Sequence, residues 1–206
     1  TKTTFAKYAK ITSTYGLSGA QAARHMLSGA GITNVAIEQA GGFLSDHYDP
    51  VSRTLRLSPG VYGSNSLAAV GVACHEAGHA IQHARGFVFL HARTALVPAT
   101  NLSSWLSYPV FFFGLILNTP ALVWVGIVLF SASVVFALVT LPVEWDASAR
   151  AKRLMVETGV VPSAEARVAG HVLDAAFLTY VAAAVSSLLT LLYYLMRSGL
   201  LGGRDD

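Results

Sequence analysis

The residues of this chain best suited to chemistry are His75, Glu76 and His79, which form an H-E-x-x-H pattern. They lie in a run that predicts a helix from Ser66 to about Arg85. Four helical residues turn through roughly 400°, so the two histidines lie on one face, one turn apart. Their ring nitrogens could bind one zinc ion together. Glu76 points about 100° away from His75, which suits it to take a proton from a metal-bound water rather than to bind the metal.

The surroundings of this pattern favour a metal over the alternative, a helix with two ordinary histidines. Most neighbouring positions are small and apolar, which predicts a buried helix; they are Val70, Val72, Ala73, Cys74, Ala77, Gly78 and Ala80. Two histidines and a glutamate are costly to bury unless something pairs with them, and a metal is a natural partner. Cys74 is predicted to be a packed apolar residue rather than a ligand, because adjacent helical residues diverge by about 100°.

Composition indicates a membrane protein. The chain has 206 residues, of which 12% are charged and 53% are hydrophobic, whereas about 25% of a typical soluble protein is charged. This length suits one domain, or a small soluble module joined to a membrane part. The net charge of +3 is small and scattered, which argues against nucleic acid as a partner. A single cysteine excludes a disulfide within the chain.

The segment before the predicted metal helix has the pattern of a small antiparallel β unit. Alternating residues predict strands over 33–39 and 52–57, and Gly41-Gly42 and Asp49-Pro50 predict turns between them. A short helix is predicted from Ser18 to Ser28, with Ser18 as its cap. In many zinc peptidases an edge strand beside the site pairs with an extended substrate, so this order of elements fits a peptidase.

Three uncharged stretches predict transmembrane helices. Residues 94–143 contain no charged side chain, and Asn118-Thr119-Pro120 divides this run into spans over 102–117 and 121–141. These two spans predict a hairpin, and residues 175–196 predict a third span. The expected fold is a mainly helical membrane protein with a small β unit. Its predicted regions are a peptidase region 1–93, the hairpin 94–141, a helical segment 142–171 that carries the third ligand, and a final span with a tail, 172–206.

The strongest candidate for a third zinc ligand is Glu144. The predicted hairpin returns the chain to the side of the membrane that holds His75, and Glu144 is expected to begin a helix there. The alternative is that Glu144 only favours a helix N-terminus. His83 and His91 are interpreted as bystanders or supporting residues, because a catalytic zinc needs an open position for water.

The distribution of Lys and Arg predicts which side of the membrane carries the site. Residues 1–93 hold eight of these side chains and residues 142–171 hold four, whereas the hairpin turn at 118–120 holds none. By the positive-inside rule the site faces the cytoplasm. The chain is therefore expected to cross the membrane several times, with the site on the cytoplasmic side.

Four segments together resemble the YugP-like family of bacterial membrane-embedded neutral zinc metallopeptidases. They are residues 45–50, 55–58, 75–82 and 141–144, and they occur in order along nearly the whole chain. The resemblance implies a gluzincin-like site in which His75, His79 and a downstream glutamate hold zinc and Glu76 acts as the base. Members of that family usually begin with a transmembrane helix before a basic segment, which here is residues 1–15 with Lys2, Lys7 and Lys10. The resemblance therefore also implies such a helix upstream of residue 1, and it implies the bacterial inner membrane as the location.

A more distant likeness connects the chain with the HtpX and CAAX prenyl protease group. Those proteins place the third ligand in an E-x-E-A-D pattern, and Glu144-Trp145-Asp146-Ala147-Ser148 occupies that frame. Ser148 stands where the group has an aspartate that supports a zinc histidine. A serine can still make one hydrogen bond but carries no charge, which puts that supporting role in doubt and leaves the ligand role of Glu144 unaffected.

These observations predict a membrane-bound zinc endopeptidase that hydrolyses peptide bonds with a zinc-activated water and Glu76 as general base. The expected partners are a peptide or protein substrate, including membrane proteins, and the lipid bilayer. The oxyanion-stabilising group is left open between Tyr180, His171 and His83. One alternative function is a zinc-binding membrane scaffold or chaperone-like pseudo-protease with little turnover. Another is a small transporter with Asp174 and His171 along its path.

Overall fold

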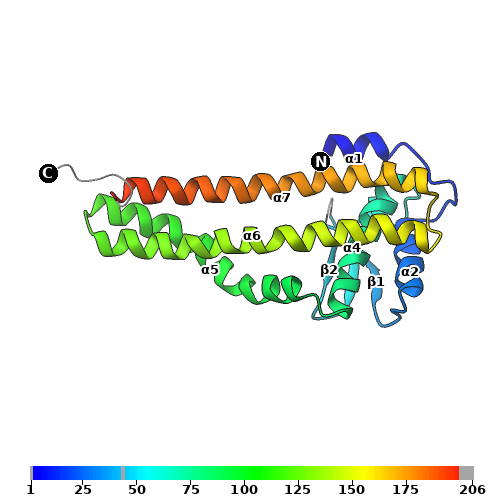
Figure 1. Cartoon of the computed structure of the whole chain (residues 1–206), viewed down its shortest axis with the longest axis horizontal. Coiled ribbons are helices and arrows are strands. Elements are labelled where there is room, and N and C mark those ends of the chain that lie inside the picture. Colours follow the sequence, from blue (N-terminus) through cyan, green and yellow to red (C-terminus); the bar gives the residue numbers. More distant parts are fainter. Residues whose placement is uncertain (1, 43–44, 200–206) are drawn as a thin grey trace. The chain divides into compact units, whose positions relative to one another are not determined.

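The computed structural model describes residues 2–42 and 45–199, which form seven helices and three strands (Figure 1). The chain separates into two compact units. The first unit comprises the described residues among 1–90 and 143–179, and the second comprises those among 91–142 and 180–206. The first unit contains the predicted metal helix. Residues 200–206, which make up nearly all of the predicted tail, lie outside the described residues.

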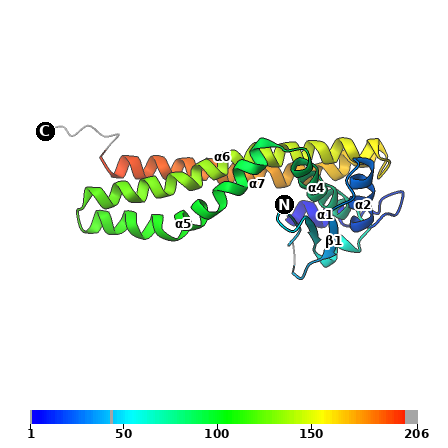
Figure 2. The same cartoon turned by 90° about the horizontal axis from the view of Figure 1, so that it is seen from below.

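The first unit is built around helix α4 (Leu67–Ala84). Helices α1 (Lys2–Tyr8), α2 (Gly19–Gly29) and α3 (Pro59–Tyr62) all contact it. Figure 2 shows α1 and α2 beside α4. Thirteen of the 18 residues of α4 are buried, which confirms the prediction from its small apolar composition. The core of the unit joins α4 to α2, to the sheet and to the residues beyond 150.

Helices α2 and α4 each begin at a serine cap, Ser18 and Ser66. The Ser66 hydroxyl accepts a hydrogen bond from the Ala69 backbone N–H, which leaves one fewer unpaired donor at the start of α4. Ser18 and Gln21 form a reciprocal capping box at α2. These local hydrogen bonds explain why both helix starts could be read from the sequence.

The sheet is mixed rather than antiparallel, which corrects the prediction. Its strands are β1 (Ala36–Gln39), β2 (His47–Asp49) and β3 (Thr54–Leu57), in the order β1-β3-β2. Strand β2 was not predicted. It pairs antiparallel with β3, which is the pairing that the prediction gave to the strand over 33–39. Strand β1 therefore lies on the other side of β3 and runs parallel to it. The short turn after Asp49 favours the β2–β3 hairpin, because this side chain accepts the Val51 N–H at 2.9 Å.

Helices α6 (Pro120–Glu157) and α7 (Ser163–Arg197) are each continuous. The prediction that a new helix begins near Glu144 is therefore wrong, because α6 passes through Pro142 without ending. Proline removes one backbone hydrogen bond from a helix. Beyond it, Val143, Ala147 and Ala151 are fully buried, and their packing stabilises the helical backbone.

The second unit consists of α5 (Val88–Ile116) from residue 91 onward and parts of α6 and α7. Its core combines aromatic and aliphatic side chains, with the Phe111 and Tyr194 rings stacked at 3.8 Å between centroids. Among the described residues, two helices, α6 and α7, are long and apolar enough to cross a membrane. The predicted span over 102–117 lies in α5, which is not one of these two, and it stays a prediction.

Candidate metal centre

Helix α4 places His75 and His79 on one face, as the four-residue spacing predicts. Their rings lie 4.8 Å apart between centroids and are inclined at 83° to each other. His79 is buried, whereas His75 retains partial exposure. Two imidazoles that converge in this way from one helix can share one metal ion.

Glu144 of α6 completes the group. Its Oε2 atom lies 3.1 Å from His75 Nε2 and 3.6 Å from His79 Nε2, and the residue is only 1% exposed. The donor atoms of the three side chains all lie within 4.8 Å of one another. Two imidazole nitrogens and one carboxylate oxygen form a donor set that suits zinc and leaves a fourth position for water.

The charges around His79 favour its protonated form when no metal is bound. Burial acts to lower the pKa of His79, because it disfavours the charged ring. The contact with Glu144 and the negative charge of Glu76 outweigh burial, and the pKa of His79 is raised. Because a metal binds the neutral ring, protons compete with it, and metal affinity falls as the pH drops through this raised pKa.

Glu76 lies beside His75 on α4 and is half-buried. It is not a member of the three-residue donor group. A carboxylate beside a metal site that is not itself a ligand can exchange a proton with a water bound to the metal.

Both histidines have a hydrogen-bond partner at Nδ1. The Ser148 hydroxyl lies 3.1 Å from His75 Nδ1, so this serine does contact a histidine of the group from the frame position of the aspartate. The Gln82 side-chain oxygen lies 2.9 Å from His79 Nδ1. Sequence reasoning missed Gln82; its position three residues after His79, on the same face of the helix, was the available signal.

Gly78 allows α4 and α6 to approach closely. A Cβ atom at this position would lie 2.7 Å from the backbone oxygen of Ala147 and 3.3 Å from its Cα atom. Ala147 follows Glu144 by three residues on α6, so the absent side chain helps to bring the third donor to the histidines.

We therefore expect Gly78→Ala to weaken zinc binding by about tenfold or more and to lower the free energy of unfolding by about 1–3 kcal/mol, because the clash forces the helices apart. Competition with a zinc chelator and thermal unfolding would measure the two effects. Gly63→Ala is the matched control, because nothing lies within 4 Å of its Cβ position and its φ is −95°. Unchanged zinc affinity in Gly78→Ala would show that the close approach does not position Glu144.

Other candidates from the sequence lie outside the donor group. His83 Nδ1 is 2.9 Å from the Tyr48 hydroxyl, and both side chains line a cavity of 250 Å³. Burial raises the pKa of Tyr48, which keeps its hydroxyl protonated. Cys74 is fully buried, and burial raises the pKa of its thiol.

His171 and Asp174 have partners away from the donor group. His171 Nδ1 lies 3.2 Å from the Tyr8 hydroxyl, and the Asp174 carboxylate accepts a hydrogen bond from Lys152. Tyr180 belongs to the second unit. None of the three belongs to the group of potential metal donors.

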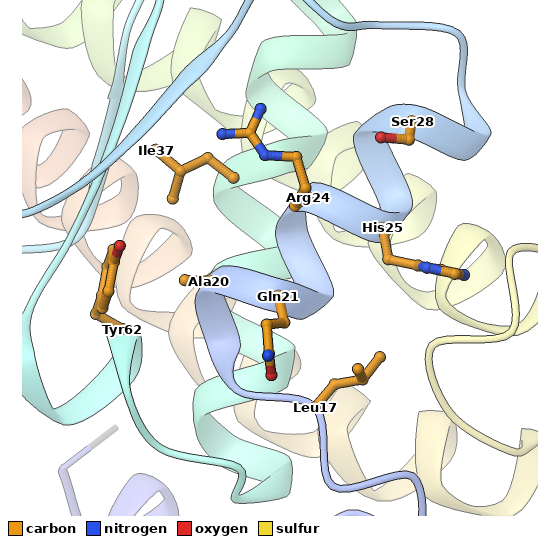
Figure 3. Close-up of a pocket in the computed structure, with 8 residues that line it drawn as sticks. All are labelled: Leu17, Ala20, Gln21, Arg24, His25, Ser28, Ile37 and Tyr62. Atoms are coloured by element: carbon orange, nitrogen blue, oxygen red, sulfur yellow. The ribbon is translucent and has the colours of Figure 1, made fainter.

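The first unit also contains a cavity of 460 Å³ beside α2, shown in Figure 3. It is lined by none of the predicted site residues. Its two basic side chains are already paired, since Arg24 donates to the Val35 carbonyl at 2.9 Å and His25 Nε2 lies 2.7 Å from the Thr158 carbonyl. This cavity therefore adds nothing to the metal centre.

Two histidines of an H-E-x-x-H helix and a glutamate from a second helix could hold a metal, and these are the donor types of a zinc-peptidase centre. Comparison with known proteins agrees with that class. Residues 1–199 match the family described as "Putative neutral zinc metallopeptidase", and the chain belongs to this family, which implies Zn²⁺ as its metal. The chain is 43% identical over 205 residues to "Putative membrane protease YugP" of Bacillus subtilis (strain 168), covering 100% of this chain and 90% of that protein. No solved structure matches the chain.

Proposed function

We propose that the chain is a membrane-bound zinc-dependent endopeptidase, with His75, His79 and Glu144 as the zinc ligands and Glu76 as the general base. The observation that carries this proposal is the convergence of the three donors within 4.8 Å of one another, from two helices far apart in the sequence. The family and the relative's name support the same activity.

The chain's own residues supply binding and proton transfer. Bound zinc would polarise the scissile carbonyl and lower the pKa of a water molecule. Glu76 removes a proton from that water and then delivers it to the leaving amine. Glu144 contributes a negative charge that offsets part of the metal's charge, while Ser148 and the Gln82 amide hold the two histidine rings.

Strand β2 is the best-placed element to hold an extended peptide. It lies at an edge of the sheet, and it contacts α4. An edge strand presents backbone donors and acceptors that a substrate backbone can pair with. A peptide bound there lies beside the helix that carries the ligands, which fits endopeptidase activity on an unfolded segment.

A bilayer is the proposed surroundings of the apolar helices. In the most apolar 18-residue segments of α6 and α7, only 28% and 6% of the segment is buried, so most of their apolar surface faces outward. Such surface is stable in lipid and unfavourable in water. The excess of Lys and Arg in residues 1–93 and 142–171 supports a cytoplasmic site in a protein that crosses the inner membrane several times.

Metal removal tests the proposal. The purified protein should contain about one zinc per chain, and a chelator should reduce cleavage of a fluorogenic peptide by at least about 100-fold, because the nucleophilic water depends on the metal. Added zinc should restore cleavage. Elemental mass spectrometry and a fluorogenic peptide assay would measure both quantities. Full cleavage by metal-free protein would contradict the proposal, and zinc without cleavage would favour the scaffold function.

A further inference from the structure

Gln82 is fully buried, and its amide contacts two helices. On α4, its oxygen lies 2.9 Å from His79 Nδ1. On α6, its amide nitrogen donates to the Val143 backbone oxygen and to Asp146 Oδ2, both at 2.8 Å. Val143 immediately precedes Glu144 in the chain. One side chain therefore connects a histidine of the metal group to the helical turn that carries the third donor.

The orientation of this amide follows from its partners. A backbone oxygen and a carboxylate both accept hydrogen bonds, so the end of Gln82 that faces them must be the NH₂ group. The other end is then the oxygen, which can only accept from His79 Nδ1–H. With its hydrogen on Nδ1, neutral His79 keeps the lone pair on Nε2, the nitrogen that lies 3.6 Å from Glu144, and this lone pair is available to a metal.

Asp146 and Arg150 hold the amide in this orientation. Arg150 Nε donates to the same Asp146 oxygen at 2.5 Å, one helical turn along α6. The arginine keeps the carboxylate in place as an acceptor for Gln82. His75 lacks such a fixed support, because the Ser148 hydroxyl can rotate and either donate or accept.

We propose that Gln82 is a positioning residue that fixes the tautomer and orientation of His79 and couples them to the Glu144 turn through Asp146. This inference rests on the proposed function only in taking His79 as a zinc ligand. Partners that orient a ligating histidine affect metal affinity even though they do not touch the metal.

The first test is Gln82→Met in the full chain, purified in detergent micelles. Methionine has a similar length and fills the space but removes all three hydrogen bonds. Zinc affinity, measured by chelator competition, should fall by about 10–100-fold. The visible spectrum of the cobalt-loaded protein should also change, because it reports ligand geometry. Glu157→Gln is the control, since this exposed residue also lies on α6 and pairs with an arginine, at 3.6 Å.

A rescue experiment separates positioning from packing. Gln82→Glu keeps the acceptor for His79 but faces the Asp146 carboxylate with a second negative oxygen, so zinc affinity should fall. Adding Asp146→Asn removes the negative charge opposite the new carboxylate, and the double variant should recover part of the lost affinity. Such coupling between two sites is the signature of a direct contact.

Two results would overturn the inference: wild-type zinc affinity and an unchanged cobalt spectrum in Gln82→Met, or additive losses in the double variant. If Gln82→Met does not fold, the double variant alone decides. Failure of the proposed function gives a different result. A wild-type protein that binds zinc but cleaves no peptide contradicts the peptidase, whereas weaker zinc binding in Gln82→Met then still supports the inference.

Discussion

Glu76→Gln should lower the rate of peptide hydrolysis by about 10²–10⁴-fold, the range expected for loss of a general acid–base group. Glutamine has nearly the same size and can still form hydrogen bonds, but it cannot accept the proton of the attacking water. Because Glu76 lies outside the donor group, zinc content should remain near one per chain. Initial rates on a fluorogenic peptide, together with elemental mass spectrometry on the same sample, would measure both effects.

The matched control for Glu76 is Glu38→Gln, which removes an exposed carboxylate from β1. It should retain wild-type activity. A Glu76→Gln protein with full activity would contradict the proposed mechanism. A Glu76→Gln protein that had lost its zinc would instead show that this carboxylate helps to hold the metal.

Glu144→Ala should reduce zinc content from about one per chain to nearly none. The substitution removes one of three protein ligands, so the affinity loss should exceed the roughly 10–100-fold expected for a supporting residue. It also removes the buried negative charge that lies beside the two imidazoles and attracts the cation. Zinc content after dialysis and chelator competition would measure the loss.

Glu165→Ala is the control for zinc loss in Glu144→Ala, because it removes a different carboxylate from the first unit. Glu165 accepts backbone and hydroxyl hydrogen bonds from Thr14, outside the donor group, so its zinc content should remain at the wild-type value. Zinc retained in full by Glu144→Ala would contradict the ligand assignment. His83, His171 and Asp174 would then be the next residues to replace.

Much of the site could be predicted because its signals are local. The spacing of His75 and His79 determines their common face, and a serine beside an apolar run marks the start of α4. The hairpin turn at 118–120 also falls where a proline and polar residues interrupt the apolar run: α5 ends at Ile116 and α6 begins at Pro120. None of these features depends on contacts between distant segments.

The features that were missed depend on such contacts. The pairing of β1 with β3 is decided by β2, a three-residue strand too short to show a pattern. Helix α6 continues through Pro142 because residues beyond it are buried against other elements. Gln82 reads as an ordinary polar residue near a helix end until α6 brings Asp146 to it.

Because Cys74 is buried, its reaction with a thiol reagent can measure local opening of the protein. This thiol is the single one in the sequence, and it lies next to His75 on α4. Burial raises its pKa and blocks access to it. A thiol-reactive dye therefore cannot react with it in the closed structure. The labelling rate therefore reports how often α4 separates from its neighbours. That measurement follows the metal helix without any engineered label, and it leaves every proposed ligand in place.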